Sequence, residues 1–71
     1  MGNARKLEIR FAVFKDYFKN DLNFIDTYPV IYGTQAEAEA TKMRLEAGQD
    51  KSWFDTAGEE QPFLYVDQIA V

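Results

Sequence analysis

A single strong helix start in the middle of the chain limits what this sequence can fold into. In Gly33-Thr34-Gln35-Ala36-Glu37, Thr34 stands as an N-cap three residues before Glu37, which is the spacing of a capping box. The next segment, QAEAEATKMRLEA, consists mostly of strong helix formers, and Gly48 stands where a C′ glycine ends a helix. We therefore predict one helix between Thr34 and Gly48, with the chain on either side left to form strands.

The helix carries small side chains that suggest which side faces a sheet. At about 100° per residue, one narrow stripe contains Ala36, Ala40, Met43 and Ala47, and the opposite side contains Ala38 and Leu45. Because small side chains let a helix lie close to a sheet that carries bulky rings, we predict that the Ala36 stripe faces the sheet. Leu45 is then expected on the outer side of the helix.

The first strand shows a regular alternation that later slips. Between Leu7 and Val13, apolar residues alternate with Glu8, Arg10 and Ala12, as in a half-buried strand. After Val13, rings fall on the polar face and lysines fall on the apolar face. One extra residue in a strand reverses the side of every later side chain, so we predict a bulge near Phe14 or Lys15. Without a bulge, some of these rings must face outward.

A turn and a second strand follow the first strand. Asn20 and Asp21 tolerate left-handed backbone, so Lys19-Asn20-Asp21 predicts a hairpin. The second strand is expected from Leu22 to Tyr32. Pro29 cannot donate to a strand ladder, which indicates an edge strand or a bulge at that point.

The segment after the helix is polar except for Trp53-Phe54. Residues 49–61 form either a compact loop that these rings anchor to the core, or a short helical turn between Asp50 and Asp55. Pro62 then opens the last strand, FLYVDQIAV. Its two faces are both apolar, which predicts a strand that is buried on both sides or that meets a second subunit.

These elements predict the fold class. The order β-β-α-β over residues 1–71 indicates one α+β domain with a three-stranded, largely antiparallel sheet and one helix on one face. A right-handed crossover lays the third strand beside the first and gives sheet order 2-1-3. The alternative order 1-2-3 would put Pro29 in a central strand.

Composition excludes most catalytic chemistry. The chain has 71 residues with no cysteine and no histidine, so thiol and imidazole nucleophiles, bases and metal ligands are absent. Such a short chain buries only about 60% of its unfolded surface, so stability must come from an aromatic core or from self-association. Acidic residues gather in one loop, at Asp50, Asp55, Glu59 and Glu60. We interpret them as a solvated surface and predict no enzyme activity, no cofactor and no metal.

The charge balance limits the classes of partner that the protein can bind. Twelve acidic and eight basic residues give a net charge of −4, unlike the basic stripe of a nucleic-acid binder. No apolar run approaches the length of a membrane span, and MGNARKLEIR lacks the apolar core of a signal peptide. We expect a cytoplasmic protein that binds neither membranes nor nucleic acid directly.

Protein binding is the function that remains. Aromatic residues are enriched at interface hot spots, and acidic groups steer association with a basic partner. We expect Phe11, Phe24 and Phe63 in the core because they continue clean alternations. The predicted contact residues are Asp16, Tyr17, Asp21, Asp26, Tyr28, Tyr32, Trp53, Asp55 and Tyr65.

In size, acidity, absence of cysteine and its β-β-α-β pattern with Thr34 to Glu37 at the helix start, the chain resembles small accessory proteins of phages and prophages, anti-CRISPR and other inhibitors among them. The resemblance implies an inhibitor or regulator that occupies a partner's surface, sometimes by imitating nucleic-acid charge. A net charge of −4 is modest for such a mimic, which favours mixed aromatic and acidic recognition. The alternative is a structural or regulatory homodimer without a catalytic role.

Overall fold

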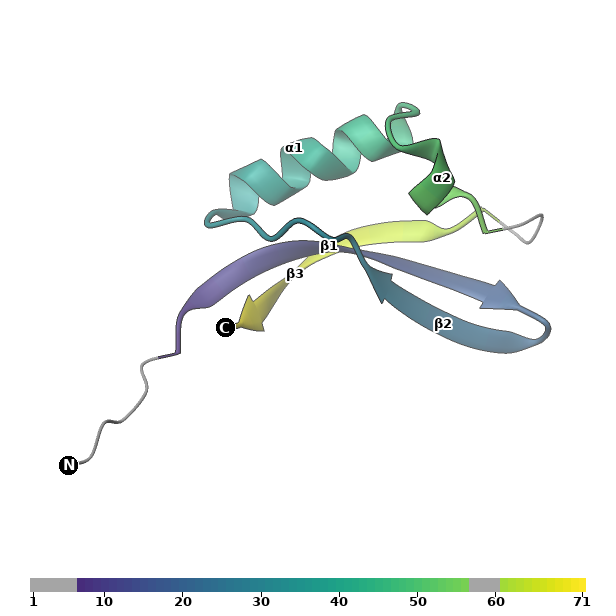
Figure 1. The fold of residues 1–71 in the computed structure, drawn as a ribbon, viewed down its shortest axis with the longest axis horizontal. Helices are drawn as coiled ribbons and strands as arrows, with labels where there is room; N and C mark the ends of the chain where they lie inside the picture. Colours follow the sequence, from purple (N-terminus) through teal and green to yellow (C-terminus); the bar gives the residue numbers. More distant parts are fainter. Residues whose placement is uncertain (1–6, 57–60) are drawn as a thin grey trace.

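Three antiparallel strands and two helices form two layers in the computed structural model, which describes residues 7–56 and 61–71. The elements in chain order are β1 (Ile9–Lys19), β2 (Leu22–Thr27), α1 (Gln35–Glu46), α2 (Lys51–Phe54) and β3 (Phe63–Ala70). The strand order is β2-β1-β3, and both helices lie on the same side of the sheet (Figure 1). The predicted α+β fold with order 2-1-3 is confirmed.

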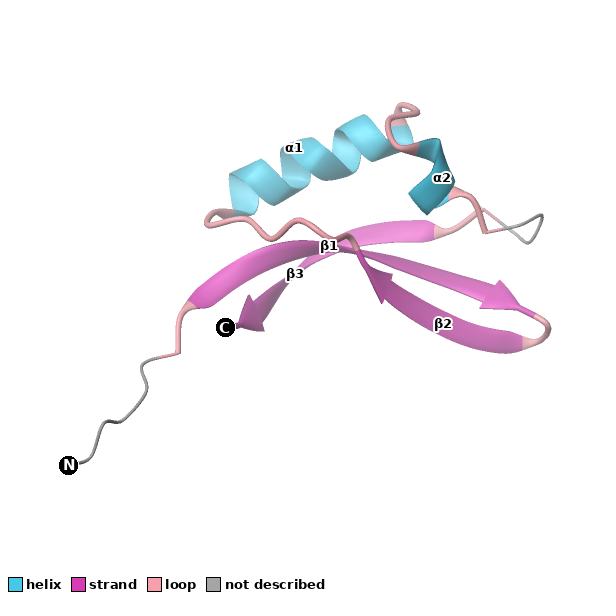
Figure 2. Ribbon diagram, in the orientation of Figure 1, coloured by secondary structure: helices cyan, strands magenta, loops and turns pink. Residues whose placement is uncertain are grey.

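A two-residue turn joins β1 to β2. Asn20 and Asp21 have φ of 54° and 63°, and Lys19 pairs directly with Leu22. Positive φ at both central residues defines a type I′ turn, which matches the twist of a hairpin. The hairpin predicted from Asn20 and Asp21 is therefore confirmed, and its tip extends beyond the helices (Figure 2).

The predicted bulge near Phe14 or Lys15 is wrong. β1 pairs with β3 without a break from Ile9↔Ala70 to Asp16↔Phe63, and with β2 without a break from Phe14↔Thr27 to Lys19↔Leu22. Lys15 instead keeps its place on the helix-covered face. It lies between aromatic rings, where its stem is buried and its ammonium group has polar partners.

The chain departs from β2 earlier than predicted. After Thr27, the Tyr28 N–H donates to the Val13 carbonyl at 2.8 Å, and Tyr32 then forms a bridge with Phe11. Between these two contacts with β1, residues 29–31 belong to no strand; we call this segment the bypass. The prediction of an edge or a bulge at Pro29 is thus confirmed, because this residue lies in the bypass and donates to no ladder.

The ends of α1 follow the sequence signals. The Thr34 hydroxyl accepts a hydrogen bond from the Glu37 N–H at 3.2 Å and donates to the Glu37 carboxylate at 2.9 Å. At the other end Gly48 has φ of 112°, a left-handed conformation that suits glycine, and its N–H donates to the Leu45 carbonyl. Of the two alternatives for residues 49–61, the short helical turn is observed as α2, and Trp53 and Phe54 of this turn pack against the core.

The predicted face of α1 is wrong. Ala38, Thr41 and Leu45 are buried against the sheet, whereas Met43 is 68% exposed. Alanines occur on two opposite sides of this helix, Ala36 and Ala40 on one and Ala38 on the other, so their small size does not fix which side faces the sheet. Each side also carries one large apolar side chain, and the structure buries Leu45 at 1% exposure and leaves Met43 in solvent.

The core lies between the helices and β1 and β3. Its buried members are Val13, Tyr28, Ala38, Leu45 and Leu64, with partly buried Phe11, Tyr32, Trp53, Phe54 and Val66 around them. The core assignment of Phe11 is thus confirmed in part. The assignments of Phe24 and Phe63 are wrong, because Phe24 lies on the projecting hairpin and is 38% exposed, and Phe63 lies on the other face of the sheet.

Candidate protein-binding surface

The sheet surface opposite the helices carries large apolar side chains from all three strands. Register fixes its members, because residues that pair directly across antiparallel strands point to the same side. Phe14 pairs with Tyr65, and Asp16 pairs with both Ile25 and Phe63. We call this surface the open face; its apolar members are Phe14, Phe18, Ile25, Phe63, Tyr65 and Ile69.

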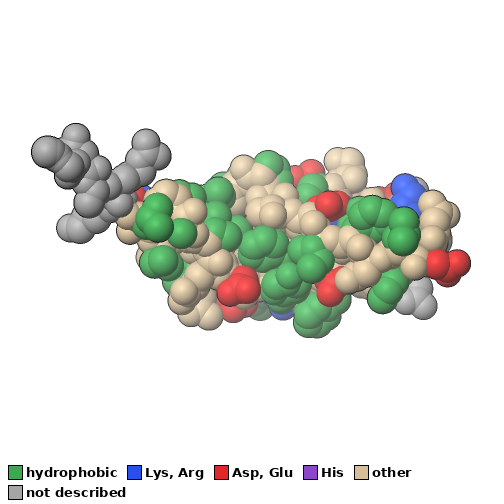
Figure 3. All heavy atoms as spheres, turned by 90° about the horizontal axis from the view of Figure 1, so that it is seen from below, with side chains coloured by type: hydrophobic (Ala, Val, Ile, Leu, Met, Phe, Trp, Pro, Cys, Tyr) green, Lys and Arg blue, Asp and Glu red, His purple; other side chains and the backbone are tan. Residues whose placement is uncertain are grey.

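The rings of the open face stack on one another while remaining accessible to solvent. The ring centroids of Phe14 and Tyr65 are 5.3 Å apart, and those of Phe63 and Tyr65 are 6.1 Å apart. Phe63 is 67% exposed, Phe18 is 56% exposed and Ile25 is 55% exposed. Figure 3 views the molecule from this side and shows hydrophobic side chains gathered across its centre, with acidic groups among them.

Two carboxylates lie among these rings. Asp16 accepts a hydrogen bond from the Asn23 side-chain amide at 2.6 Å, and Asp67 accepts one from the Gln68 backbone N–H at 2.7 Å. Within the described part of the chain, neither carboxylate forms an ion pair. Arg10, which shares this face, is paired with Glu8. The open face therefore presents uncompensated negative charge beside exposed rings.

Tyr28, one of the predicted contact residues, is part of the core. It is buried, its ring meets Trp53 edge-on at a centroid distance of 5.0 Å, and its hydroxyl donates to the Asp50 carboxylate at 2.7 Å. The hydrogen bond to Asp50 raises the pKa of Tyr28, with burial adding to the effect. These contacts place Tyr28 and most of Trp53 away from solvent, and they tie α2 to the sheet.

A second group of predicted residues surrounds Lys15. The Lys15 ammonium group donates to the Trp53 carbonyl, lies 4.5 Å from the Trp53 ring centroid and 5.1 Å from that of Tyr17. Asp26 is 3.8 Å from the ammonium group and accepts the Tyr17 hydroxyl at 2.8 Å, which raises the pKa of Tyr17. These side chains satisfy one another, so we assign them a structural role.

The remaining predicted residues are dispersed. Tyr32 packs at the core edge beside Phe11, Asp21 is at the hairpin tip, and Asp55 follows α2. Of the nine predicted contact residues, the structure brings Asp16 and Tyr65 together on the open face. The predicted contact residues do not include the other members of this surface: Phe14, Phe18, Ile25, Phe63, Asp67 and Ile69. For Phe14 and Phe18 of β1, an unbroken alternation is the signal, and it gives the outward-facing rings expected in the absence of a bulge.

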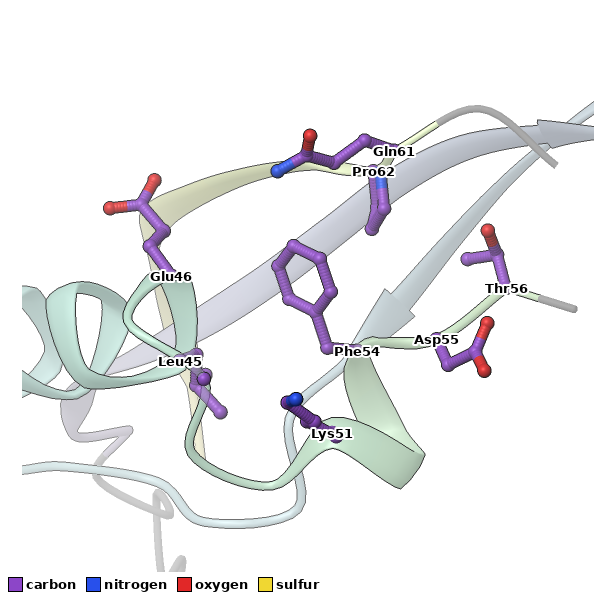
Figure 4. Close-up of a pocket in the computed structure, with 9 residues that line it drawn as sticks. Leu45, Glu46, Lys51, Phe54, Asp55, Thr56, Gln61 and Pro62 are labelled. Atoms are coloured by element: carbon purple, nitrogen blue, oxygen red, sulfur yellow. The ribbon is translucent and has the colours of Figure 1, made fainter. Parts of the chain in front are cut away.

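A separate hollow lies where the end of α1, α2 and the start of β3 meet (Figure 4). Its volume is about 450 Å³, within the range of small-molecule sites. The Phe54 ring projects into its middle, between Leu45 on one side and Pro62 on the other. The charged side chains around the hollow are Lys51 on one hand and the carboxylates Glu46 and Asp55 on the other, with the Thr56 hydroxyl beside them. Glu59 and Glu60, predicted to share this acidic loop, lie outside the described residues.

Across residues 7–56 and 61–71, no three acidic side chains come close enough to hold a metal ion. In the part of the chain that the structure describes, no helix has the length and apolar character needed to span a membrane. Comparisons of the chain with protein-family models, with curated proteins and with solved structures each gave no match.

Proposed function

We propose that this protein is a small non-catalytic binding module that inhibits or regulates a larger protein by covering part of its surface with the open face. The observation that carries the proposal is a set of six large apolar side chains from three strands on one side of the sheet, of which Phe18, Ile25 and Phe63 are exposed and the other three are half-buried. The resemblance to phage-encoded inhibitors is consistent with this function and stays a prediction.

The size of the exposed surface supports binding. A phenylalanine contributes roughly 150–250 Å² when fully buried, so Phe18 and Phe63 together leave about 250 Å² of apolar surface accessible. Ile25 and the partly exposed members of the open face add to this area. The total reaches the range of the largest apolar patch on a typical monomer, and such patches commonly mark interaction sites.

The charges on the open face indicate the chemistry of the partner. Asp16 and Asp67 flank the stacked rings and lack ion-pair partners among the described residues, and the whole chain carries a net charge of −4. A complementary surface is apolar, with one lysine or arginine placed opposite Asp16 within the patch and another opposite Asp67 on the edge strand. Rim charges of this kind mainly raise the association rate, whereas the central rings determine the dissociation rate.

Site-specific photo-crosslinking tests the proposal. A photoreactive phenylalanine analogue replaces Phe63 in one variant and Met43 in a matched control, since these side chains are equally exposed at 67% and 68% but lie on opposite sides of the molecule. We expect the Phe63 variant to form a covalent adduct with a different protein in cells, and the Met43 variant to form none. Identical adducts at both positions, or adducts with this chain alone, would contradict the proposal.

Titration with the captured protein then tests the recognition chemistry. Phe63→Ala is expected to weaken binding at least tenfold, whereas Met43→Ala leaves affinity unchanged. Asp67→Asn should lower the association rate and reduce its dependence on salt, because the rim charge is lost. Wild-type affinity in Phe63→Ala would exclude the open face as the contact.

A further inference from the structure

The two edges of the sheet are built differently. β2 has six residues, ends at Thr27, and is followed by Pro29 and the bypass of residues 29–31. β3 has eight residues, Phe63 to Ala70, without proline, lysine, arginine or a break in register. Proteins commonly protect edge strands with short length, proline, positive charge or bulges. β2 has such protection, whereas Asp67 is the one charged residue along β3.

The hydrogen-bond pattern shows which backbone groups of β3 face outward. Glu8 and Val71 exchange both backbone hydrogen bonds, at 3.0 and 2.9 Å. Because bonded pairs alternate along an antiparallel ladder, the odd-numbered residues of β3 bond to β1, and the even-numbered residues direct their N–H and C=O groups outward. The outward residues are Leu64, Val66, Gln68 and Ala70.

The outward groups of β3 are largely free to pair. Among the described residues, no backbone group outside β1 bonds to β3, and the Gln68 N–H is bonded to the neighbouring Asp67 side chain. Leu64 and Val66 therefore present N–H and C=O groups side by side along an apolar strand. An added antiparallel strand satisfies these groups in the same way that β1 satisfies the inner edge.

We propose that β3 pairs antiparallel with β3 of a second copy of this chain, with Val66 on the two-fold axis, to form a continuous six-stranded sheet. In this register Val66 opposes Val66 of the second copy, and Leu64 opposes Gln68, so outward groups meet outward groups. On the open face Phe63 opposes Ile69 and Tyr65 opposes Asp67. The strand is thus complementary to itself in both hydrogen bonding and side-chain chemistry.

Side chains select this register over its neighbours. Sliding the second strand by two residues in one direction sets Asp67 directly against Asp67 of the second copy, a like-charge contact on the axis. Sliding it in the other direction opposes Phe63 with Asp67 and shortens the paired segment. The register with Val66 on the axis avoids both the Asp67–Asp67 contact and the shortened pairing. It places the two open faces side by side and covers neither, so the dimer presents two copies of the binding surface.

Sedimentation across a concentration series tests the proposal on the full chain. We expect a monomer–dimer equilibrium in the wild type and a monomer in Gln68→Pro, because proline cannot donate to Leu64 of the second copy and its ring occupies the outer edge, while the ladder to β1 is kept. Thr27→Pro is the matched control, since register places its N–H at the outer edge of β2, and it should dimerise like the wild type. A wild type that stays monomeric at its highest soluble concentration overturns the proposal, as does a Gln68→Pro variant that still dimerises.

Cysteine crosslinking tests the register. The chain has no cysteine, so Val66→Cys introduces one thiol on the axis, where paired Cα atoms are about 5.5 Å apart and within disulfide range. We expect Val66→Cys to form a covalent dimer on mild oxidation and Gln68→Cys, whose thiols lie several residues apart, to form far less. Equal yields from both variants refute this register. The strand-pairing tests are independent of the open-face proposal. Phe63→Ala, which tests the open face, leaves the backbone groups of β3 unchanged, so the two proposals can fail separately.

Discussion

Replacing Lys15 with methionine tests how a buried ammonium group is accommodated in the core of a small protein. The Lys15 side chain is 7% exposed, and its ammonium group donates to the Trp53 carbonyl beside the rings of Trp53 and Tyr17. Methionine has a similar length and flexibility, so Lys15→Met keeps most of the buried stem and removes the charge. The change therefore isolates the polar contacts.

The contacts of Lys15 determine the expected change in the free energy of unfolding. Loss of the hydrogen bond from a charged donor costs about 1.5–3 kcal/mol, and each cation–π contact contributes about 1 kcal/mol. The ion pair with half-exposed Asp26, at 3.8 Å, adds less than about 1 kcal/mol. These favourable contacts are opposed by the cost of burying an ammonium group, several kcal/mol, and methionine does not carry this cost. We expect a net loss of about 1–2 kcal/mol, equivalent to a fall in melting temperature of about 5–15 °C for a chain of this size.

Urea denaturation followed by Trp53 fluorescence measures this change, because the chain has one tryptophan and it lies beside the substituted residue. Lys42→Met is the control. Lys42 forms an i,i+4 ion pair with Glu46 at 3.2 Å on the helix surface, so its loss should cost less than about 0.5 kcal/mol. A Lys15→Met protein as stable as the wild type, or more stable, would refute the reasoning and show that desolvation outweighs the polar contacts.

Three further predictions concern the folded state. The raised pKa values of Tyr17 and Tyr28 mean that the folded protein holds these protons more tightly than the unfolded chain. Their contribution to stability is therefore complete below about pH 10 and declines as the pH rises further. Thermal melts across this pH range should show a smaller decline in Tyr28→Phe than in the wild type. Thr34→Ala removes the N-cap of α1 and should lower the free energy of unfolding by about 1 kcal/mol, whereas Thr34→Ser should restore most of it in the same assay. Leu45→Ala should cost about 2–5 kcal/mol by urea denaturation and Met43→Ala less than about 0.5 kcal/mol; the reverse order would mean that α1 presents its other face to the sheet.

The strand-pairing proposal bears on these assays, because association of folded monomers raises apparent stability with protein concentration. Denaturation of the monomeric Gln68→Pro variant beside the wild type separates the two effects. Substitutions in the core should then have the same cost in both backgrounds. A cost of Lys15→Met that depends on the background would indicate coupling between β3 pairing and the core.

Local chemistry in the sequence was sufficient for the elements and their order. Thr34 and Gly48 set the ends of α1 because a cap and a left-handed residue act on their own backbone neighbours. Asn20 and Asp21 set the hairpin because positive φ at both positions requires residues that tolerate it. Pro29 pointed to an edge position for the second strand because proline has no N–H to donate; in the structure it lies just beyond β2, which is the edge strand.

Tertiary structure alone decided which side chains are buried. Small alanines lie on two opposite sides of α1 and do not fix its orientation; packing buries the side with Ala38 and Leu45 against Val13 and Leu64. Sequence patterns indicated no partner for Lys15 on an apolar face because Trp53, whose carbonyl and ring it contacts, lies 38 residues away; a bulge was therefore the simpler explanation. Once Lys15 is accommodated, β1 runs without a bulge, and the rings of Phe14 and Phe18 must point to the side without helices. The open face therefore depends on long-range contacts of Lys15 that local sequence patterns do not contain.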